Sequence, residues 1–455
     1  MKLSPAEIAT ALGAEVLAEG PEESPRRATI DSTESGPGDL FFGLRGEKRD
    51  GGEFALDAIA AGAWGVVIGR DRAMQRASSP GGAGSRGWVF RVEDPLAAMQ
   101  VLARAWRQAL GAGVVGVTGS VGKTSVKDIS KALLPGRVHA NRENLNTEIG
   151  LPLTILEAPD DTDLMVLEMA MRGRGQIAEL AAIAEPEVAV ITNVGPVHVE
   201  LLGSVAAIAA AKAEILDDLP PGGTVVAPVE AGALEPHLEP IARQLRFGPG
   251  GDVEATEAMV EDGVTEALVR TPLGSQVFRF SFTEGYNLTN ALAAVAAGVA
   301  LGADLGGMAD RAASIRFSSF RGERLELPGG IVLVNDCYNA NPVSMRAALD
   351  HLAGLGAERT VAVLGEMGEL GQGAPGYHRE VGEHARAHGI DLVIGVGLPA
   401  RDYDPDELVA DPAEAAELLA ARLEPGDAVL VKGSRSAGLE AVAEQLPELV
   451  ESADG

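Results

Sequence analysis

The chain has 455 residues, which is more than one hydrophobic core usually organises and predicts about three domains. Hydrophobic residues make up 46% and charged residues 23%, so the chain is expected to fold rather than to be disordered. The net charge of −29 argues against nucleic acid or an anionic membrane as the main partner, because both need clustered cations, and the lone cysteine, Cys337, excludes a disulfide within the chain.

Residues 1–105 are predicted to form a first domain. They begin without the apolar run of a signal peptide, and the alanine-rich residues 291–303 are too short to span a bilayer, so we expect a cytoplasmic protein that inserts into no membrane. Strands are predicted for residues 40–44 and 63–68, and the glycine- and serine-rich residues 78–85 predict a flexible loop. The oligomeric state is not readable from the residues, and a monomer is the expectation.

A second domain, residues 106–317, is organised around a strand, a glycine turn and a helix. The apolar residues 114–117 predict the strand, and the spacing of apolar residues within 126–133 predicts the helix. Between them, residues 118–124 read Thr-Gly-Ser-Val-Gly-Lys-Thr. Backbone N–H groups in such a turn can surround a phosphate, the helix N-terminus adds positive potential, and Lys123 adds a full charge.

The turn departs from the strict P-loop pattern, which has a glycine where Val117 stands. Its Gly-Lys-Thr ending still lies between a predicted strand and a predicted helix, and Thr124 offers a hydroxyl to a magnesium ion. We therefore predict a nucleoside triphosphate site. The alternative is a structural glycine turn with Lys123 in solvent.

Two further strands of this domain end at residues that can carry chemistry. Residues 164–167 are followed by Glu168, and residues 188–192 are followed by a loop that holds His198. Because ligands of open parallel sheets bind at the carboxyl ends of the strands, both side chains are expected beside the phosphates, where a carboxylate suits magnesium. The alternatives are a glutamate that stabilises a helix start and an ordinary loop histidine.

Three cationic residues are candidates for the site, and each also has a plausible structural role. Lys212 lies in an alanine-rich helical segment, where a solvated lysine is the ordinary case. Arg321 and Arg324 lie at the junction with the third domain, where they can bind phosphate in a bidentate manner or form salt bridges between domains.

Residues 318–455 are predicted to form a third domain of the nucleotide-fold type. Four short apolar runs predict buried parallel strands, namely residues 331–334, 361–364, 392–396 and 429–431. The polar residues 336–342 follow the first of these strands and are a site candidate or a helix cap. Residues 432–436 follow the last strand, and their paired cations indicate anion recognition.

Taken together, these segments resemble the Mur ligase family, the ATP-dependent amide ligases of peptidoglycan synthesis. The resemblance covers nearly the whole chain. It is carried by residues 118–124, 144–150, Glu168, residues 192–195 with His198, and residues 211–214, 287–290 and 432–436. Residues 37–41 and 336–342 are similar to the member that adds D-alanyl-D-alanine to UDP-N-acetylmuramoyl-tripeptide, and the Asp-Asn-Pro-Arg signature of the diaminopimelate-adding relative is absent.

The resemblance implies an α/β protein with three domains: a small N-terminal domain for the UDP-sugar, a central P-loop ATPase with a parallel sheet, and a Rossmann-like C-terminal domain. It implies ATP and Mg²⁺ as cofactors and UDP-MurNAc-tripeptide and D-Ala-D-Ala as substrates. ATP would phosphorylate the tripeptide carboxylate, and the amine of D-Ala-D-Ala would attack the acyl phosphate. Cell-wall synthesis, and through it cell shape and division, would be the biological role.

The resemblance also implies roles for individual residues. ATP would be bound by Gly119, Ser120, Val121, Gly122, Lys123, Thr124, Ser125, Asn287, Asn290, Arg321, Arg324 and Asp336. The substrates would be bound by Asp31, Ser32, Thr33, Asn144, Asn146, Thr147, Arg172, Tyr338, Asn339, Lys432, Ser434 and Arg435. Metal ions would be held by Thr124, Glu168, His198 and, if carbamylated, Lys212, and the catalytic residues would be Lys123, Glu168, His198 and Lys212.

Three positions depart from the family pattern, and two other functions stay open. Tyr286, Thr147 and Thr33 stand where relatives often have histidine, asparagine and arginine, respectively. One alternative is a folylpolyglutamate synthase, which shares the ATPase core without the UDP-sugar domain. The other is a P-loop ATPase that uses hydrolysis as a conformational switch. The third residue of the tripeptide, diaminopimelate or lysine, is not readable.

Overall fold

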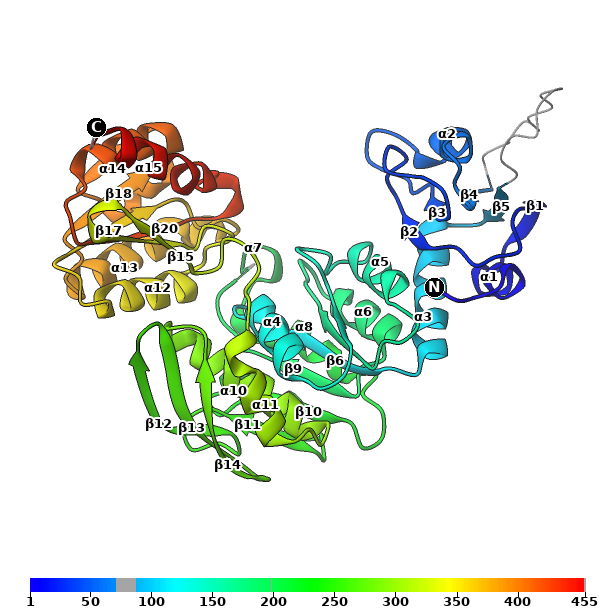
Figure 1. Cartoon of the computed structure of the whole chain (residues 1–455), viewed down its shortest axis with the longest axis horizontal. Coiled ribbons are helices and arrows are strands. Elements are labelled where there is room, and N and C mark those ends of the chain that lie inside the picture. The colour runs from blue at the N-terminus through cyan, green and yellow to red at the C-terminus, as the bar shows by residue number, and fades with distance from the viewer. Residues whose placement is uncertain (71–86, 198, 454–455) are drawn as a thin grey trace.

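A computed structural model describes residues 1–70, 87–197 and 199–453 of the chain. In these residues it shows an α/β protein with an N-terminal, a middle and a C-terminal domain that follow one another along the molecule (Figure 1). The α/β class predicted from the sequence is confirmed. The predicted loop at residues 78–85 and His198 lie outside the described residues.

The N-terminal domain is built on a sheet with the strand order β1-β5-β4-β3-β2. Its strands are β1 (Glu15–Ala18), β2 (Arg27–Thr29), β3 (Asp39–Phe42), β4 (Gly65–Gly69) and β5 (Trp88–Val92), and its helices are α1 (Pro5–Leu12), α2 (Ala55–Ala60) and α3 (Pro95–Leu110). Only the β1–β5 pair among these strands is antiparallel. Helix α1 begins where Ser4 and Glu7 form a capping box, and it ends at Gly13, which has a left-handed φ of 60°.

Helix α3 connects the N-terminal domain to the middle domain and runs through residues 105 and 106, where the sequence predicts the domain boundary. Phe42 of β3, Trp106 of α3 and Leu151 of α5 (Gly150–Glu157) belong to one continuous buried cluster. The two domains therefore share a hydrophobic core.

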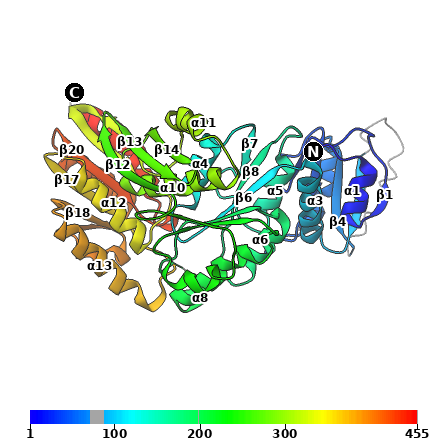
Figure 2. The ribbon, with the colours of Figure 1, turned by 90° about the horizontal axis from the view of Figure 1, so that it is seen from below.

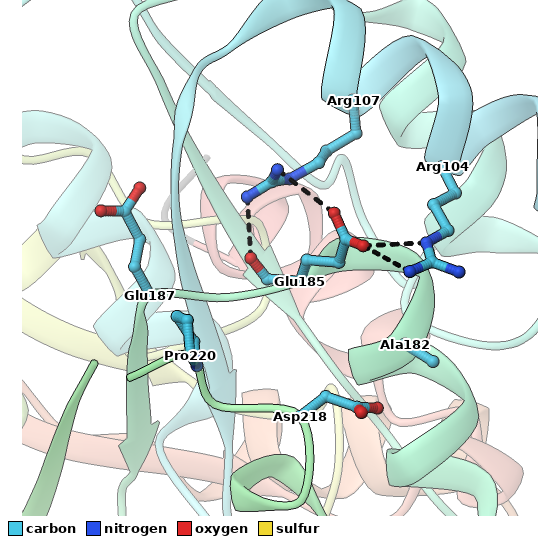
Figure 3. A pocket seen from close by; sticks show the side chains of 7 residues that line it. All are labelled: Arg104, Arg107, Ala182, Glu185, Glu187, Asp218 and Pro220. Carbon is cyan, nitrogen blue, oxygen red and sulfur yellow. Dashed lines mark hydrogen bonds and ion pairs between the residues drawn. The ribbon is translucent and has the colours of Figure 1, made fainter. Parts of the chain in front are cut away.

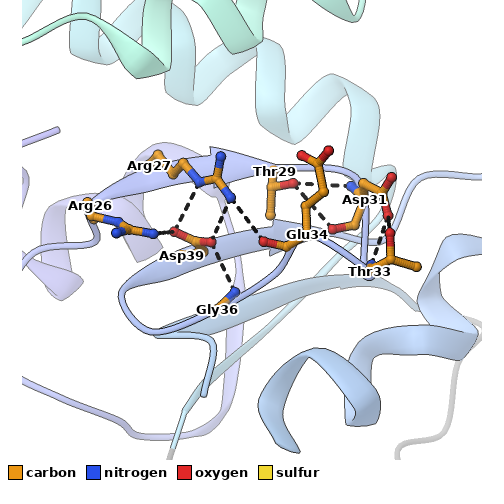
Figure 4. A network of polar contacts seen from close by, with 8 residues as sticks. All are labelled: Arg26, Arg27, Thr29, Asp31, Thr33, Glu34, Gly36 and Asp39. Atoms are coloured by element: carbon orange, nitrogen blue, oxygen red, sulfur yellow. Dashed lines mark hydrogen bonds and ion pairs between the residues drawn. The ribbon is translucent and has the colours of Figure 1, made fainter. Parts of the chain in front are cut away.

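A buried aspartate organises the start of β3 in the N-terminal domain (Figure 4). Asp39 is fully buried and accepts hydrogen bonds from the guanidinium groups of Arg26 and Arg27 and from the backbone N–H of Gly36. Burial works to raise the pKa of Asp39, but the hydrogen bonds from Arg27 and Arg26 outweigh it and hold the pKa below its ordinary value. The ionised carboxylate thus ties β2 to β3.

Replacing Asp39 with asparagine is expected to destabilise this sheet by about 2 kcal/mol, because charged hydrogen bonds are lost at a buried site. The stabilisation from a depressed pKa is present at neutral pH and is lost as the pH falls through that pKa. Hydrogen exchange of the β2 and β3 amides measures the effect locally, which suits a chain of several domains. The exposed Asp57, changed to asparagine, is the control. Equal protection in both variants would contradict a structural role of the Asp39 charge.

The middle domain has a parallel sheet with the strand order β11-β10-β9-β6-β8-β7. The strands are β6 (Gly113–Thr118), β7 (Val138–Ala140), β8 (Leu164–Glu168), β9 (Val188–Ile191), β10 (Thr224–Pro228) and β11 (Gln244–Phe247). Besides α5, the helices are α4 (Lys123–Leu133), α6 (Gln176–Ala184), α7 (Val199–Leu202), α8 (Val205–Ala213), α9 (Glu235–Leu238), α10 (Gly285–Ala300) and α11 (Leu305–Arg311). Because the strands are parallel, β6, β8 and β9 all end at the same edge.

An antiparallel sheet of β12 (Glu254–Glu261), β13 (Val264–Thr271) and β14 (Gly274–Phe280) extends the middle domain. Its Phe278 and Phe280 join a second buried cluster together with Ile129 of α4 and Ala294 of α10. Small alanine side chains on α10 allow this helix to lie close against α4, which brings the start of α10 beside the glycine turn.

The C-terminal domain has a sheet with the strand order β15-β16-β20-β17-β18-β19. Its strands are β15 (Glu323–Leu327), β16 (Ile331–Asn335), β17 (Arg359–Leu364), β18 (Leu392–Val396), β19 (Glu407–Val409) and β20 (Asp427–Lys432), and its helices are α12 (Pro342–Gly354), α13 (Ala374–Ala387), α14 (Pro412–Arg422) and α15 (Glu440–Ala453). The predicted strands pair in parallel, and the sequence analysis missed the edge strands β15 and β19. Helices α14 and α15 cover one face of this sheet and α12 and α13 the other (Figure 1), and Figure 2 shows the molecule from the side of α12 and α13. No helix among the described residues is long and apolar enough to cross a membrane.

Candidate active site

The glycine turn joins β6 to α4 at the carboxyl edge of the middle sheet. Gly122 has a φ of 82°, which favours glycine, and a Cβ on Gly119 would lie 1.8 Å from the hydroxyl oxygen of Thr192. Helix α4 begins at Lys123, and Gly122 provides no side-chain cap. The first N–H groups of α4 are thereby left to an external acceptor such as a phosphate.

Asn193 holds the backbone of the glycine turn in place. Its side-chain oxygen accepts hydrogen bonds from the N–H groups of Ser120 and Val121, at 3.1 and 2.9 Å. The hydroxyl of Thr192 donates to the carbonyl of Val121 at 2.5 Å. The sequence analysis gave Asn193 no role of its own, although a polar residue just beyond a buried strand was the signal available.

Glu168 lies at the end of β8, opposite the first turn of α4, and is 2% exposed. Its two carboxylate oxygens accept hydrogen bonds from the hydroxyl of Thr124 and from the amide of Asn146, each at 2.8 Å. The backbone N–H of Glu168 donates to the side chain of Asn141, which directly follows β7 and which the sequence analysis did not single out. A hydroxyl and a carboxylate that face each other are hard oxygen ligands, and they fit magnesium.

Three cations lie close enough to this carboxylate or to each other to interact. The ammonium of Lys123 donates to the carbonyl of Gly119 at 3.0 Å. Burial lowers the pKa of Lys123; Glu168 opposes that shift, and Arg321 adds to it. Burial, and then the charge of Lys123, put the pKa of Lys212 well below its ordinary value. Lys212 is 2% exposed, so the solvated lysine that the local sequence favoured is wrong.

The first turn of α10 abuts the glycine turn. A Cβ on Gly122 would lie 2.4 Å from the side-chain oxygen of Asn290. Asn290 donates to the side-chain oxygen of Asn287 at 3.1 Å, and Asn287 donates to Glu284 at 3.2 Å. The two asparagines predicted to bind ATP are thus connected to each other and to the turn.

Arg321 lies between the middle and C-terminal domains. Its guanidinium stacks over the ring of Tyr338, with Cζ 4.1 Å from the ring centroid. Its Nε is buried and has no hydrogen-bond partner, which is costly and leaves a donor for a ligand. Arg324 instead pairs with Glu326 on the same strand, at 3.7 Å.

The two polar loops of the C-terminal domain are held together by Lys432. This lysine is 2% exposed, and its ammonium donates to the carboxylate of Asp336 at 2.5 Å and to the carbonyl of Asn339 at 3.0 Å. The hydroxyl of Ser434 accepts from the N–H of Gly368. Lys432 therefore fixes the conformation of the loop at residues 336–342 through hydrogen bonds to two of its residues.

The remaining predicted substrate residues are spread over all three domains. Asp31 accepts hydrogen bonds from the N–H and the hydroxyl of Thr33 in the N-terminal domain (Figure 4), and Ser32 between them is half-buried. Arg172 reaches Glu369 of the C-terminal domain at 3.8 Å. Asn144 and Thr147 lie before α5, and Arg435 lies after β20. Ser125, which was predicted to bind ATP, lies in the buried first turn of α4. The structure brings residues 119–125, Glu168 and Asn290 together, and it leaves the N-terminal residues in a separate domain.

Two cavities in the described part of the chain differ in character. One, of about 490 Å³, lies by α3 and α6, and its Arg104 and Arg107 are both paired with Glu185 (Figure 3). Glu187 and Asp218 line it as well, so three carboxylates against two guanidinium groups make this cavity no anion site. The other, of about 410 Å³, lies between α7 of the middle domain and residues 370–377 of the C-terminal domain.

The glycine turn with its uncapped helix start, the buried carboxylate beside it and the flanking cations form the arrangement that is typical of a P-loop enzyme acting on a nucleoside triphosphate. Sequence families match in the same order along the chain. The Mur ligase family catalytic domain matches residues 27–107, the Mur ligase middle domain residues 117–298, and the Mur ligase glutamate ligase domain residues 320–435.

Curated relatives named UDP-N-acetylmuramoyl-tripeptide–D-alanyl-D-alanine ligase are similar over almost the full length. The Synechocystis protein is 40% identical over 90% of this chain and 89% of its own length. The Escherichia coli protein is 34% identical, with 92% of this chain and 93% of that protein covered. The chain belongs to the Mur ligase family, and it is an ATP-dependent ligase.

Solved structures agree with this assignment. MurF from Acinetobacter baumannii has a TM-score of 0.88 and 27% identity, with 98% of this chain and 99% of that chain covered. MurF from Thermotoga maritima, solved in complex with ADP, has a TM-score of 0.83 and 30% identity, with 94% and 98% covered.

Proposed function

We propose that the chain adds D-alanyl-D-alanine to UDP-N-acetylmuramoyl-tripeptide, with cleavage of ATP, in the synthesis of peptidoglycan precursors. The observation that carries this proposal is the extent of the likeness: relatives with this activity in their names cover 90% to 98% of the chain, the N-terminal domain included. A folylpolyglutamate synthase structure covers only 77% of the chain at 20% identity, and that likeness supports the fold alone.

Activation of the tripeptide brings two anions together, a carboxylate and the terminal phosphate of ATP. Lys123 and the N-terminus of α4 would offset this repulsion and stabilise the charge that develops on the transferred phosphoryl group. The unpaired Nε of Arg321 provides a further donor. The amine of D-Ala-D-Ala would then attack the acyl phosphate and release phosphate.

Thr124 and Glu168 would hold a magnesium ion, because their facing oxygens fit its preference for hard ligands. When bound, the ion would neutralise charge on the phosphates. We also propose that His198 and Lys212 act as ligands, Lys212 after carbamylation. The buried position of Lys212 supports this, since a lowered pKa favours the neutral amine that reacts with carbon dioxide.

We propose a separate binding role for each domain. Residues 1–105 would bind the UDP-sugar through Asp31, Ser32 and Thr33, residues 106–317 would bind ATP, and residues 318–455 would supply Asp336, Tyr338, Asn339 and Arg435. One chain contains every part of this site, so we propose a monomer. Substrates linked to nucleotides, together with ATP, fit a cytoplasmic enzyme.

Phosphate release from ATP tests this function when substrates are omitted one at a time. We expect turnover only when UDP-MurNAc-tripeptide and D-Ala-D-Ala are both present, because closure of the domains around the substrates completes the site. Tripeptides with diaminopimelate and with lysine at the third position are compared in parallel. Turnover with folate and glutamate would instead support the synthase, and turnover with ATP alone would support a switch ATPase.

A further inference from the structure

A cluster of three possible metal ligands lies between α12 and α13, on residues that the proposed ligase reaction does not use. It consists of Asp350 on α12, His384 on α13 and His388 just after α13. One ligand atom from each residue lies within 4.8 Å of the other two. His384 and His388 are four residues apart and share one side of the helix, with ring centroids 4.0 Å apart.

The hydrogen bonding of His388 turns its outer nitrogen toward Asp350. Nδ1 of His388 lies 2.9 Å from the main-chain carbonyl oxygen of His384. Since a carbonyl oxygen can only accept, Nδ1 carries the hydrogen, and the neutral ring then presents a lone pair at Nε2. That Nε2 faces an oxygen of Asp350 at 3.5 Å. Either a proton on Nε2 or a metal ion satisfies this nitrogen and the carboxylate together, and a hydrogen bond from the opposite ring nitrogen is the usual way of orienting a histidine that binds metal.

The two separations that involve Asp350 lie within about 0.8 Å of those in a zinc site. Bonds of about 2.0–2.1 Å in a tetrahedral zinc site place neighbouring ligand atoms about 3.3 Å apart. The separation of 3.5 Å between Asp350 and His388 is close to this value. Asp350 and His384 are at hydrogen-bond distance, 2.5 Å, and would have to separate by about 0.8 Å for a zinc ion. The side chain of Asp350 is 51% exposed, so it is free to rotate by this amount.

The surroundings favour a cation. Arg346, one turn before Asp350 on α12, is paired with Glu380, one turn before His384 on α13, at 3.9 Å. Its charge is therefore largely offset, and the chain as a whole carries a net charge of −29. His351, the neighbour of Asp350, faces Glu284 of the middle domain at 3.8 Å. A metal ion at the cluster would therefore hold α12 against α13 beside a contact between domains.

We propose that Asp350, His384 and His388 bind one zinc ion, with water as the fourth ligand. Two imidazole nitrogens and a carboxylate oxygen suit zinc and its neighbours cobalt and nickel, whereas magnesium and calcium prefer oxygen ligands throughout. This proposal is independent of the ligase activity.

The test is a zinc titration of the full-length protein after chelator treatment, in competition with a chromophoric chelator. Excess magnesium is present throughout, so that the oxygen ligands near Glu168 do not contribute. We expect one equivalent of zinc, and Asp350→Asn and His388→Gln should each weaken its affinity by at least about tenfold. His237→Gln, which removes a partly exposed imidazole from α9, is the matched control and should bind zinc as the unchanged protein does.

Cobalt provides a second measurement that does not depend on affinity. Cobalt bound by the unchanged protein should show the strong visible absorption of a four-coordinate site, and the Asp350→Asn His388→Gln double variant should lose it. Unchanged ligase turnover of the double variant shows that it is folded. Zinc binding that is absent, or equal in the double variant and the unchanged protein, overturns the proposal.

Discussion

Replacing Lys123 with alanine is expected to lower kcat for ligation about 100- to 1,000-fold, which corresponds to roughly 3 to 4 kcal/mol of lost transition-state stabilisation. The ammonium of Lys123 lies at the N-terminus of α4 and is held against the carbonyl of Gly119. From there the ammonium can stabilise negative charge on the transferred phosphoryl group. Steady-state kinetics with saturating ATP and both substrates measure the effect.

Lys131→Ala is the matched control, because Lys131 lies on the same helix and is exposed. We expect it to keep nearly full turnover. If folded Lys123→Ala enzyme also turned over at a near-normal rate, the glycine turn would be structural and the proposed ATP site would be wrong.

Replacing Glu168 with glutamine should reduce kcat roughly 100-fold and raise the magnesium concentration needed for half-maximal rate. Glutamine keeps the shape of the side chain but removes its charge. It also turns one of the two acceptors of Glu168 into a donor, which then faces the hydroxyl of Thr124 or the amide of Asn146. The measurement is the initial rate as a function of magnesium concentration.

Glu257→Gln provides the comparison for Glu168, since it removes an exposed carboxylate from β12. It should leave the magnesium dependence unchanged. A Glu168→Gln enzyme with an unaltered magnesium requirement would show that the carboxylate only anchors α4 to β8.

Local sequence was sufficient for the elements whose signals are contained in a few neighbouring residues. The apolar run before the glycine turn and the spacing of Val126, Ile129 and Leu133 after it predicted β6 and α4. The position of Glu168 at the end of an apolar run placed it correctly at the carboxyl edge of the sheet, because parallel strands align their ends. The edge strands β15 and β19 were missed, since one is charged and exposed and the other has three residues.

The sequence by itself thus determined the α/β class, the strand, glycine turn and helix of residues 113–133, and the family. Only the tertiary structure decided that Lys212 is buried, because an alanine-rich helix is small and apolar on every side and gives no sign of which side packs inward. The same holds for Asn193 at the glycine turn and for Asp350 beside His384. Asn193 and Val121, like Asp350 and His384, are far apart along the chain. The packing of whole strands and helices brings these residues together.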